Sequence, residues 1–306
     1  AHGWPLRQYF QGRCSASLAG AATTALLCGG CRWAAGTRAG SRHAALAVGP
    51  CGPLPQEKLA RKLPAGVTPL AIVAPGSFSP PTLLHLRIFE EARDRLERTT
   101  GPGGARYVVV GGYLSPVHAA YGKESLAPAV DRLAMARLAV ADSDWLMADG
   151  WECMCQDGWT RTALVLERFA TELRRVEVAV GDAPARPGLV RTAMLCGGDV
   201  LESFAAVRPD GELLWSDADL EVILGRNGVV CIERDGADLA NFIENHPVLR
   251  KRSANITLVR PRVHTGISSS VVRRHLAAKE SIRYLVPEAV RAYIYEKRLH
   301  ELPNWS

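Results

Sequence analysis

The chain has 306 residues, of which 47% are hydrophobic and 22% charged, and its formal net charge is +6. This is the composition of a globular protein with enough apolar side chains for a buried core, and it excludes a wholly disordered chain. The longest weakly apolar run, residues 17–31, is short and rich in alanine and glycine, so we expect no membrane span.

The positive charge is concentrated near the N-terminus. Residues 1–64 hold eight lysines and arginines and a single acid, which is a net charge of +7. Of the 37 basic and 31 acidic side chains in the whole chain, the other 29 and 30 therefore nearly cancel. Because the body of the protein is close to neutral, the overall charge gives little support to nucleic-acid binding, and we expect no nucleic-acid partner.

The N-terminal region also has an unusual composition. Residues 1–56 contain no Asp, Glu or Lys but five arginines, with serine and threonine scattered among alanine and glycine. Acid-free, arginine-rich N-termini of this kind are typical of organelle transit peptides. We predict that residues 1–64 are a basic low-complexity leader addressed to a mitochondrion or plastid, and that residues 65–306 form the folded domain. The alternative is a tail without an address on a protein of the cytoplasm or nucleus.

The cysteines do not predict a metal centre. Cys28 and Cys31 have the spacing of a zinc or redox motif, but no second pair of ligands follows, so we expect no protein-held metal. Four further cysteines lie in or beside apolar runs and are expected to be small buried side chains: Cys153, Cys155, Cys196 and Cys231.

From residue 70 onward, short apolar runs alternate with amphipathic segments. The expected strands are 70–74, 107–110, 145–148, 194–196, 229–232 and 256–259, and a long loop is expected over residues 111–128. The expected helices are 86–96, 131–141, 160–175, 200–206, 268–278 and 287–297. Strands separated by helices imply right-handed crossovers and a parallel sheet covered on both faces. The predicted fold class is α/β, a doubly wound parallel sheet of the Rossmann-like kind.

The segment after the first strand has the chemistry of a phosphate site. Gly76 permits close approach of the backbone to a ligand, and the helix that follows offers its first-turn amides. Thr82 and His85 are three residues apart and share one face of that turn, where the histidine can donate to a phosphate oxygen. Taken alone, the segment also fits a capping or solvent-facing histidine.

Two other strand-to-helix junctions carry similar features. Residues 267–274, Ile-Ser-Ser-Ser-Val-Val-Arg-Arg, begin a helix with three hydroxyl groups, whose plain interpretation is N-capping. Arg273 and Arg274 oppose the helix dipole there unless an anion neutralises them. Asp199 follows the strand 194–196 and suits a ribose or adenine contact, although it could simply be an N-cap. Since ligands bind beyond the carboxyl ends of parallel strands, the three junctions together predict a nucleotide site.

Taken in chain order, these and three further segments resemble the eukaryotic nicotinamide/nicotinate mononucleotide adenylyltransferase family. The matching segments are 76–85 (GxFxPxxxxH), 115–123 (SPV and AYxK), 151–162 (WE and WxxT), 195–204 (LLCGxDLLESF), 267–274 (ISSTxxRR) and 281–287 (SIRYLVP). The resemblance covers about residues 71–300. The chain departs from the family at Ser79 and Ala119, where Asn and Asp are common.

The resemblance implies a nucleotidyltransferase of Rossmann-like fold that joins nicotinamide or nicotinate mononucleotide to ATP. The products would be NAD or its deamido form and pyrophosphate, formed by direct attack of the mononucleotide phosphate on the α-phosphorus. Mg²⁺ is expected to enter on the ATP phosphates, and a homo-oligomer is expected.

The resemblance also implies roles for individual residues. His85 and Arg273 are the expected catalytic residues. The residues expected to bind ATP are Gly76, Ser77, Phe78, His85, Gly197, Asp199, Ser270, Val271, Val272 and Arg273. The residues expected to bind the mononucleotide are Lys123, Trp159, Thr162, Leu214, Trp215 and Asn255.

Two other functions remain to be weighed. A related adenylyl- or cytidylyltransferase with another phosphate acceptor is disfavoured by the two tryptophan segments and the SPV loop, which form the acceptor pocket in the family. A non-catalytic, chaperone-like protein of the same fold is disfavoured by the joint presence of His85, Lys123, Asp199 and Arg273. An assay of ATP-dependent NAD formation separates all three.

Overall fold

The computed structural model describes residues 52–100, 104, 106–121, 126–154, 158–208, 210–234, 236–263, 265–302 and 305. The predicted leader, apart from residues 52–64, therefore lies outside the described residues, as do Lys123 and Cys155. No helix in the described ranges is long and apolar enough to cross a membrane.

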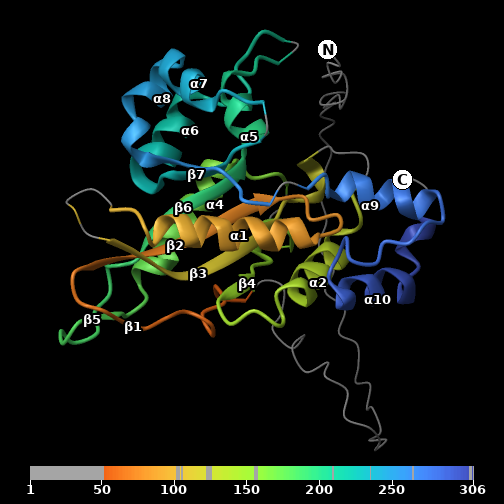
Figure 1. The fold of residues 1–306 in the computed structure, drawn as a ribbon, viewed down its shortest axis with the longest axis horizontal. Coiled ribbons are helices and arrows are strands. Elements are labelled where there is room, and N and C mark those ends of the chain that lie inside the picture. The colour runs from red at the N-terminus through yellow and green to blue at the C-terminus, as the bar shows by residue number, and fades with distance from the viewer. Residues whose placement is uncertain are drawn as a thin grey trace, which may run out of the picture. The chain divides into compact units, whose positions relative to one another are not determined.

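Six parallel strands form the central sheet, in the order β4-β3-β2-β6-β7-β8 (Figure 1). They are β2 (Val67–Gly76), β3 (Arg106–Pro116), β4 (Leu146–Ala148), β6 (Arg191–Gly197), β7 (Val229–Ile232) and β8 (Ile256–Val259). From β2 the chain adds strands in one direction, and from β6 it adds them in the other. This order confirms the predicted doubly wound Rossmann-like class, with its switch point between β2 and β6.

Ten α-helices and two further short strands lie in the described part of the chain. The helices are α1 (Leu83–Leu96), α2 (Ala129–Ala139), α3 (Trp151–Met154), α4 (Thr162–Arg174), α5 (Gly198–Glu202), α6 (Asp217–Val222), α7 (Leu239–Asn245), α8 (Pro247–Lys251), α9 (Ser269–Ala277) and α10 (Glu288–Glu296). The short strands β1 (Lys62–Leu63) and β5 (Ala179–Val180) pair with each other. The predicted helix 200–206 is shared between α5 and a 3-10 turn, Ser203–Ala205, and α3 and α6 to α8 are additional to the prediction.

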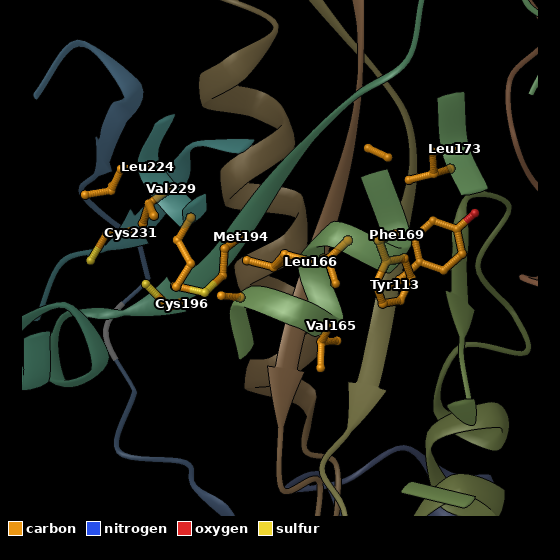
Figure 2. Close-up of a cluster of buried hydrophobic side chains, with 14 of the residues drawn as sticks. Tyr113, Val165, Leu166, Phe169, Leu173, Met194, Cys196, Leu224, Val229 and Cys231 are labelled. Atoms are coloured by element: carbon orange, nitrogen blue, oxygen red, sulfur yellow. The ribbon is translucent and has the colours of Figure 1, made fainter. Parts of the chain in front are cut away.

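The sheet separates two apolar cores, because alternate side chains of each strand point to opposite faces. Along β6, Met194 and Cys196 face α4, while Ala193 and Leu195 face α1. We call these layers the α4-side core and the α1-side core. Figure 2 shows the α4-side core, in which Phe169 packs beside Tyr113 and the buried thiols Cys196 and Cys231 lie on neighbouring strands. The prediction that these two cysteines are buried is confirmed.

A third core lies outside the sheet, between α2, α9 and α10 (Figure 1). Its central side chains include Met135 of α2, Val272 of α9 and Ile294 of α10, each fully buried. This third core places the start of α9 against the segment between β2 and α1, since the Ser269 hydroxyl donates to the Pro80 carbonyl over 2.8 Å.

The predicted domain boundary between residues 64 and 65 is wrong, because the preceding residues belong to the α4-side core. Leu54, Leu59 and Leu63 are each at most 8% exposed. The Ala60 N–H donates to the Val110 carbonyl over 2.9 Å, and the hydroxyl of Tyr113 donates to the Pro55 carbonyl over 2.8 Å. The basic side chains between these leucines remain at least partly exposed, so the local charge resembles that of a leader although the segment is folded.

The predicted loop over residues 111–128 is also wrong in its first part, because β3 continues to Pro116. Gly111 and Gly112 interrupt the apolar pattern, yet both lie in the middle of the sheet. A Cβ on Gly111 would come within 2.5 Å of Leu59, and one on Gly112 within 2.5 Å of Leu146. The two glycines therefore mark close packing on the two faces of β3 rather than the end of the strand.

Candidate functional site

The carboxyl ends of β2 and β6 mark the switch point, where an open parallel sheet has its ligand crevice. The two strands pair over Leu70–Val73 and Arg191–Met194, and beyond this paired stretch they run on to end at Gly76 and Gly197. From there the chain passes to α1, which packs in the α1-side core, and to α5, whose Leu201 packs in the α4-side core. The two segments diverge to opposite faces of the sheet, and the predicted residues Gly76, Ser77, Gly197 and Asp199 lie at these strand-to-helix junctions.

His85 is fixed at the first turn of α1 by a reciprocal cap with Thr82. The Thr82 backbone N–H donates to Nδ1 of His85 over 3.0 Å, and the Thr82 hydroxyl lies 2.7 Å from the same nitrogen. Because a backbone N–H can only donate, Nδ1 must be the unprotonated nitrogen. The neutral ring therefore carries its proton on Nε2, which makes it a hydrogen-bond donor without requiring a positive charge.

Phe78 shapes the segment that leads to this histidine. It has a φ of 46°, a strained value for a non-glycine residue, and it is only 3% exposed. Its ring meets the His85 ring edge-on, with the centroids 5.2 Å apart. A Cβ on Gly76 would approach the Phe78 ring to 3.1 Å, so a larger residue there would press against that ring.

Residues 76–82, which we call the phosphate loop, are held by donors from two other segments, α2 and α9. Arg132 of α2 donates from Nη1 to the Ser77 carbonyl over 3.1 Å. Arg273 of α9 donates from Nη1 to the Ser79 carbonyl over 3.0 Å. Together with the Ser269 bond to Pro80, these contacts fix the backbone carbonyls of the loop in place.

The serines at the start of α9 accept hydrogen bonds from different donors. Ser268 caps the helix by accepting from the Val271 N–H over 3.2 Å, and Ser270 accepts from Nη2 of Arg273 over 3.3 Å. The contact of Val272 with ATP stays a prediction. Its side chain is fully buried in the third core, and its N–H donates to the Ser268 carbonyl.

Two buried arginines remain incompletely satisfied in this region. Arg273 is 7% exposed and Arg132 is fully buried, and burial lowers the pKa of both guanidinium groups. Within the described residues, Nε of Arg273 and one Nη of Arg132 have no hydrogen-bond partner. Unsatisfied buried donors are rare, and next to a predicted polyphosphate site an anion can satisfy them.

The junction after β6 presents a carboxylate. The Asp199 side chain is 57% exposed and lies 3.3 Å from Arg234, which follows β7. A Cβ on Gly197 would come within 2.8 Å of the Asp199 carboxylate, so the glycine leaves room for it. Both predicted residues therefore lie at the carboxyl edge, as an adenosine contact requires.

The residues predicted to bind the mononucleotide come mainly from the starts of α4 and α6. Trp159 and Thr162 precede or begin α4, and Leu214 and Trp215 precede α6. Arg161 pairs with Asp219 over 3.1 Å, so the starts of α4 and α6 are adjacent.

The two tryptophans differ in their surroundings. Trp159 is 44% exposed. Trp215 is half-buried, with its ring 4.9 Å from that of Phe204 and its Nε1 donating to Ser203 over 3.0 Å.

The prediction that Asn255 binds the mononucleotide is wrong. Asn255 immediately precedes β8, so it lies at the amino edge of the parallel sheet, about 13 Å along the strand from the carboxyl edge. Its side-chain amide donates to the Leu224 carbonyl over 2.7 Å. The residue closes the turn before β8 and has no route to the crevice.

A buried acid was not among the predicted site residues. Glu152 of α3 accepts from the hydroxyl of Ser115, at the end of β3, over 3.1 Å. Burial raises the pKa of Glu152 to about 8, although Ser115 and the charge of Arg132 oppose that shift. Glu152 lies in the WE segment that the resemblance includes, so that signal was present. No sequence signal marks Arg132.

Within the described ranges, no group of three or more His, Cys, Asp and Glu side chains is placed to hold a metal ion.

A cytidylyltransferase-like family model matches residues 73–275. The nicotinamide/nicotinic acid mononucleotide adenylyltransferase of Oryza sativa is 38% identical over 257 residues, which cover 83% of this chain and 96% of the rice protein. The chain belongs to this adenylyltransferase family. The resemblance stated from the sequence motifs is therefore confirmed.

Other members of the adenylyltransferase family differ in length. Nicotinamide/nicotinic acid mononucleotide adenylyltransferase 1 of Saccharomyces cerevisiae is 40% identical over 248 residues, which cover 80% of this chain and 59% of the yeast protein. This chain thus spans about three fifths of the length of that relative. A structure of the Plasmodium falciparum nicotinic acid mononucleotide adenylyltransferase complexed with NaAD shares the fold. Its TM-score is 0.52 and its sequence identity 16%, over 76% of this chain and 97% of that one.

Proposed function

We propose that this chain transfers the adenylyl group of ATP to nicotinamide or nicotinate mononucleotide and releases pyrophosphate. The names of the yeast and rice relatives support this activity, and so does the position of the candidate site at the switch point. In the reaction, an oxygen of the mononucleotide 5′-phosphate bonds to the α-phosphorus of ATP. The bond from that phosphorus to the oxygen shared with the β-phosphate breaks, and no covalent enzyme intermediate forms.

The observation that carries the proposal is the fixed tautomer of His85. Thr82 occupies Nδ1, so Nε2–H is the donor that the ring can offer to phosphate oxygens as negative charge develops on them. Phosphoryl-group transfer needs little covalent help from the protein, and positioning and charge stabilisation supply most of the catalysis. A neutral, pre-oriented donor at the start of α1 meets that need.

The phosphate end of ATP is assigned to the α9 side of the crevice. Arg273 and Ser270 hold the β- and γ-phosphates, and the backbone of Gly76, Ser77 and Phe78 lies against the nucleotides. The side chains and amides there are hydrogen-bond donors, which suit phosphate oxygens better than a metal. We therefore propose MgATP as the substrate, with Mg²⁺ carried on its phosphates.

The adenosine portion of ATP and the mononucleotide bind at the other edges of the crevice. Gly197 and Asp199 bind the adenosine portion, and the carboxylate accepts from the ribose hydroxyls. Trp159 stacks on the pyridine ring, with Thr162, Leu214 and Trp215 lining the same pocket. Lys123 meets the phosphate of the mononucleotide.

The experiment is an assay of the purified chain with MgATP and either nicotinamide or nicotinate mononucleotide. We expect NAD or deamido-NAD to appear together with an equal amount of pyrophosphate. Replacing ATP by CTP, or the mononucleotide by another phosphate monoester, is expected to abolish product. Turnover with another acceptor alone would assign the chain to a different transferase. No turnover with any pair would indicate a non-catalytic protein.

We also propose an organellar location and a homo-oligomeric state. The location rests on the acid-free, arginine-containing composition of residues 1–56. Residues 1–51 fused to a fluorescent reporter are expected to carry it into a mitochondrion or plastid, and a diffuse cytosolic signal would refute the address. Light scattering on the purified chain tests the oligomeric state, and a single-chain mass would refute it.

A further inference from the structure

The phosphate loop has one more anchor, which lies far away in the sequence. Beyond α10 the chain makes a 3-10 turn, Leu299–Glu301, and then places Trp305 in the third core. The indole is 3% exposed, and its Nε1 donates to Oγ of Ser79 over 2.7 Å. An indole N–H is a donor only, and when it is buried it needs a partner, so this contact is a specific one.

Ser79 is the residue on which the supports of the loop converge. It is fully buried, and its Oγ also accepts from the Ala127 N–H over 2.9 Å. The two donors, Trp305 and Ala127, match the two lone pairs of the hydroxyl oxygen. The carbonyl of the same residue accepts from Arg273. One residue thus connects the segment after α10, the segment before α2, and the arginine of α9.

The position of Ser79 links this anchor to the candidate catalytic groups. Ser79 directly follows Phe78, whose ring packs against His85, and its carbonyl holds the guanidinium of Arg273. A shift of Ser79 therefore moves the supports of both His85 and Arg273. Among the contacts of the described residues, none joins Trp305 directly to His85 or Arg273, so the influence of Trp305 on them passes through Ser79.

We propose that Trp305 is a positioning residue for the phosphate loop, acting through its hydrogen bond to Ser79. The proposal rests on the proposed adenylyl transfer for its kinetic consequence, but the contact itself is independent of the reaction. The indole holds Ser79 in the place that presents His85 and Arg273 to the triphosphate. The segment after α10 is in this way part of the catalytic apparatus, although it lies outside every motif of the family resemblance.

The test uses the full chain and removes the hydrogen bond from either side. Trp305→Phe keeps most of the apolar packing and deletes the donor, while Ser79→Ala keeps the indole and deletes the acceptor. Small displacements of reacting groups can cost up to about a hundredfold in rate. We expect each variant to lower kcat about tenfold, with KM for the mononucleotide changed less than about twofold. The double variant should lose little more than Ser79→Ala alone, because Ser79→Ala already removes the bond that Trp305→Phe deletes, together with the bond from Ala127.

Tyr293→Phe is the matched control. The Tyr293 hydroxyl donates to Asp131 over 2.8 Å, joining α10 to α2 in the same third core but without contact to the loop. This variant also removes one aromatic hydrogen bond, and it should leave kcat unchanged. If Tyr293→Phe slowed turnover as much as Trp305→Phe, the effect would be one of core stability and the positioning role would be overturned.

Amide hydrogen exchange supplies a readout that does not need activity. Trp305→Phe and Ser79→Ala should speed exchange across residues 77–85 and leave residues 163–173 of α4 unchanged, while Tyr293→Phe should leave 77–85 unchanged. Unaltered exchange at 77–85 together with unaltered kcat would overturn the proposal. A wild-type chain that makes no NAD would overturn the proposed function instead, and the exchange data would then decide the role of Trp305 alone.

Discussion

The two sides of the sheet support the candidate site by different physical means. On the α1 side, the phosphate loop is held by hydrogen bonds from buried or half-buried polar side chains: Arg132, Arg273, Ser269 and Trp305. On the α4 side, the walls of the acceptor region rest on apolar packing, with the Tyr113 and Phe169 rings 5.2 Å apart and Trp215 against Phe204.

The difference matches what each side is proposed to bind. A hydrogen bond weakens steeply when its distance or angle changes, so a loop fixed by four of them presents its groups with little freedom. Transfer of a charged phosphoryl group demands such placement, because its stabilisation depends on preorganised donors. A pyridine ring needs a wall of the right shape, which apolar packing supplies. We therefore expect substitutions or deletions on the α4 side to lower mainly the stability of the fold. Substitutions on the α1 side should lower mainly the rate of catalysis.

Removal of residues 52–64 should give the largest effect and should act on stability. A chain that begins at Ala65 loses Leu54, Leu59 and Leu63, each buried in the α4-side core. A buried leucine contributes roughly 1.5–3 kcal/mol, so even after the entropy of ordering the segment we expect a loss of several kcal/mol. Against a typical total stability of about 5–15 kcal/mol, thermal unfolding should begin at least about 10 °C lower.

The control for this truncation is a chain that begins at Gly52. It lacks residues 1–51 but keeps Leu54, Leu59 and Leu63, and its melting temperature and kcat should match those of the full chain. Equal melting temperatures for the chains beginning at Gly52 and Ala65 would show that residues 52–64 only rest on the surface.

His85→Ala should give the next largest effect, and on catalysis alone. Loss of a donor to the transition state typically costs about 10²–10³ in kcat. The side chain caps α1 but is not part of an apolar core, so the melting temperature should change little. Steady-state kinetics and calorimetry on the same sample test both parts. A variant that kept more than about half of the wild-type kcat would remove His85 from the mechanism.

The fold and the phosphate side of the site could be predicted because their signals are local. The runs at 229–232 and 256–259 match β7 and β8 residue for residue, since short apolar segments bounded by turns are read directly from the pattern. Thr82 and His85 lie three residues apart at a helix start, and the cap between them is a local contact. Such features need no knowledge of the tertiary structure.

Features that depend on distant contacts could not be predicted. Leu54 and Leu59 meet their partners only after β3 and α4 have assembled, and the local charge around them suggested a leader. Asn255 lies near the matching motifs in sequence, but the direction of β8 places it at the opposite edge of the sheet. The contacts of Arg132 and Trp305 with the loop span 55 and 226 residues, and no periodicity reports them.

Glu152 should make the stability depend on pH, because it is buried between the strand end at Ser115 and the charge of Arg132. Its folded-state pKa of about 8 lies above its ordinary value of 4.5, so the folded chain keeps a proton that the unfolded chain loses. Stability should therefore fall as the pH rises from about 5 to 8, by up to about 1.4 kcal/mol per pH unit.

The matched variant is Glu152→Gln, which cannot ionise and can still accept from Ser115. Urea unfolding at pH 6 and pH 7.5 should show the wild type losing about 2 kcal/mol relative to the variant. Parallel pH profiles for the two proteins would mean that Glu152 is already ionised in the folded chain.

Arg273→Ala should weaken ATP binding more than mononucleotide binding. A hydrogen bond to a charged group is worth about 1.5–3 kcal/mol, so KM for ATP should rise about tenfold or more. The neighbouring Arg274 provides the control, since the next helix position points about 100° away and its side chain is exposed. Equal increases in both KM values for Arg273→Ala would indicate that the residue acts only through its bond to Ser79.

Trp159→Ala should give the smallest effect and should separate stacking from packing. The side chain is 44% exposed in the unliganded chain, so its removal should cost little stability. An aromatic stacking contact is worth about 0.5–1.5 kcal/mol, which corresponds to a rise of about fivefold in KM for the mononucleotide with KM for ATP unchanged. Leu164→Ala is the control, because Leu164 is 49% exposed on the first turn of α4 and has no proposed ligand contact. A lower melting temperature with an unchanged KM would assign Trp159 to the apolar support of the α4 side instead of to the ligand.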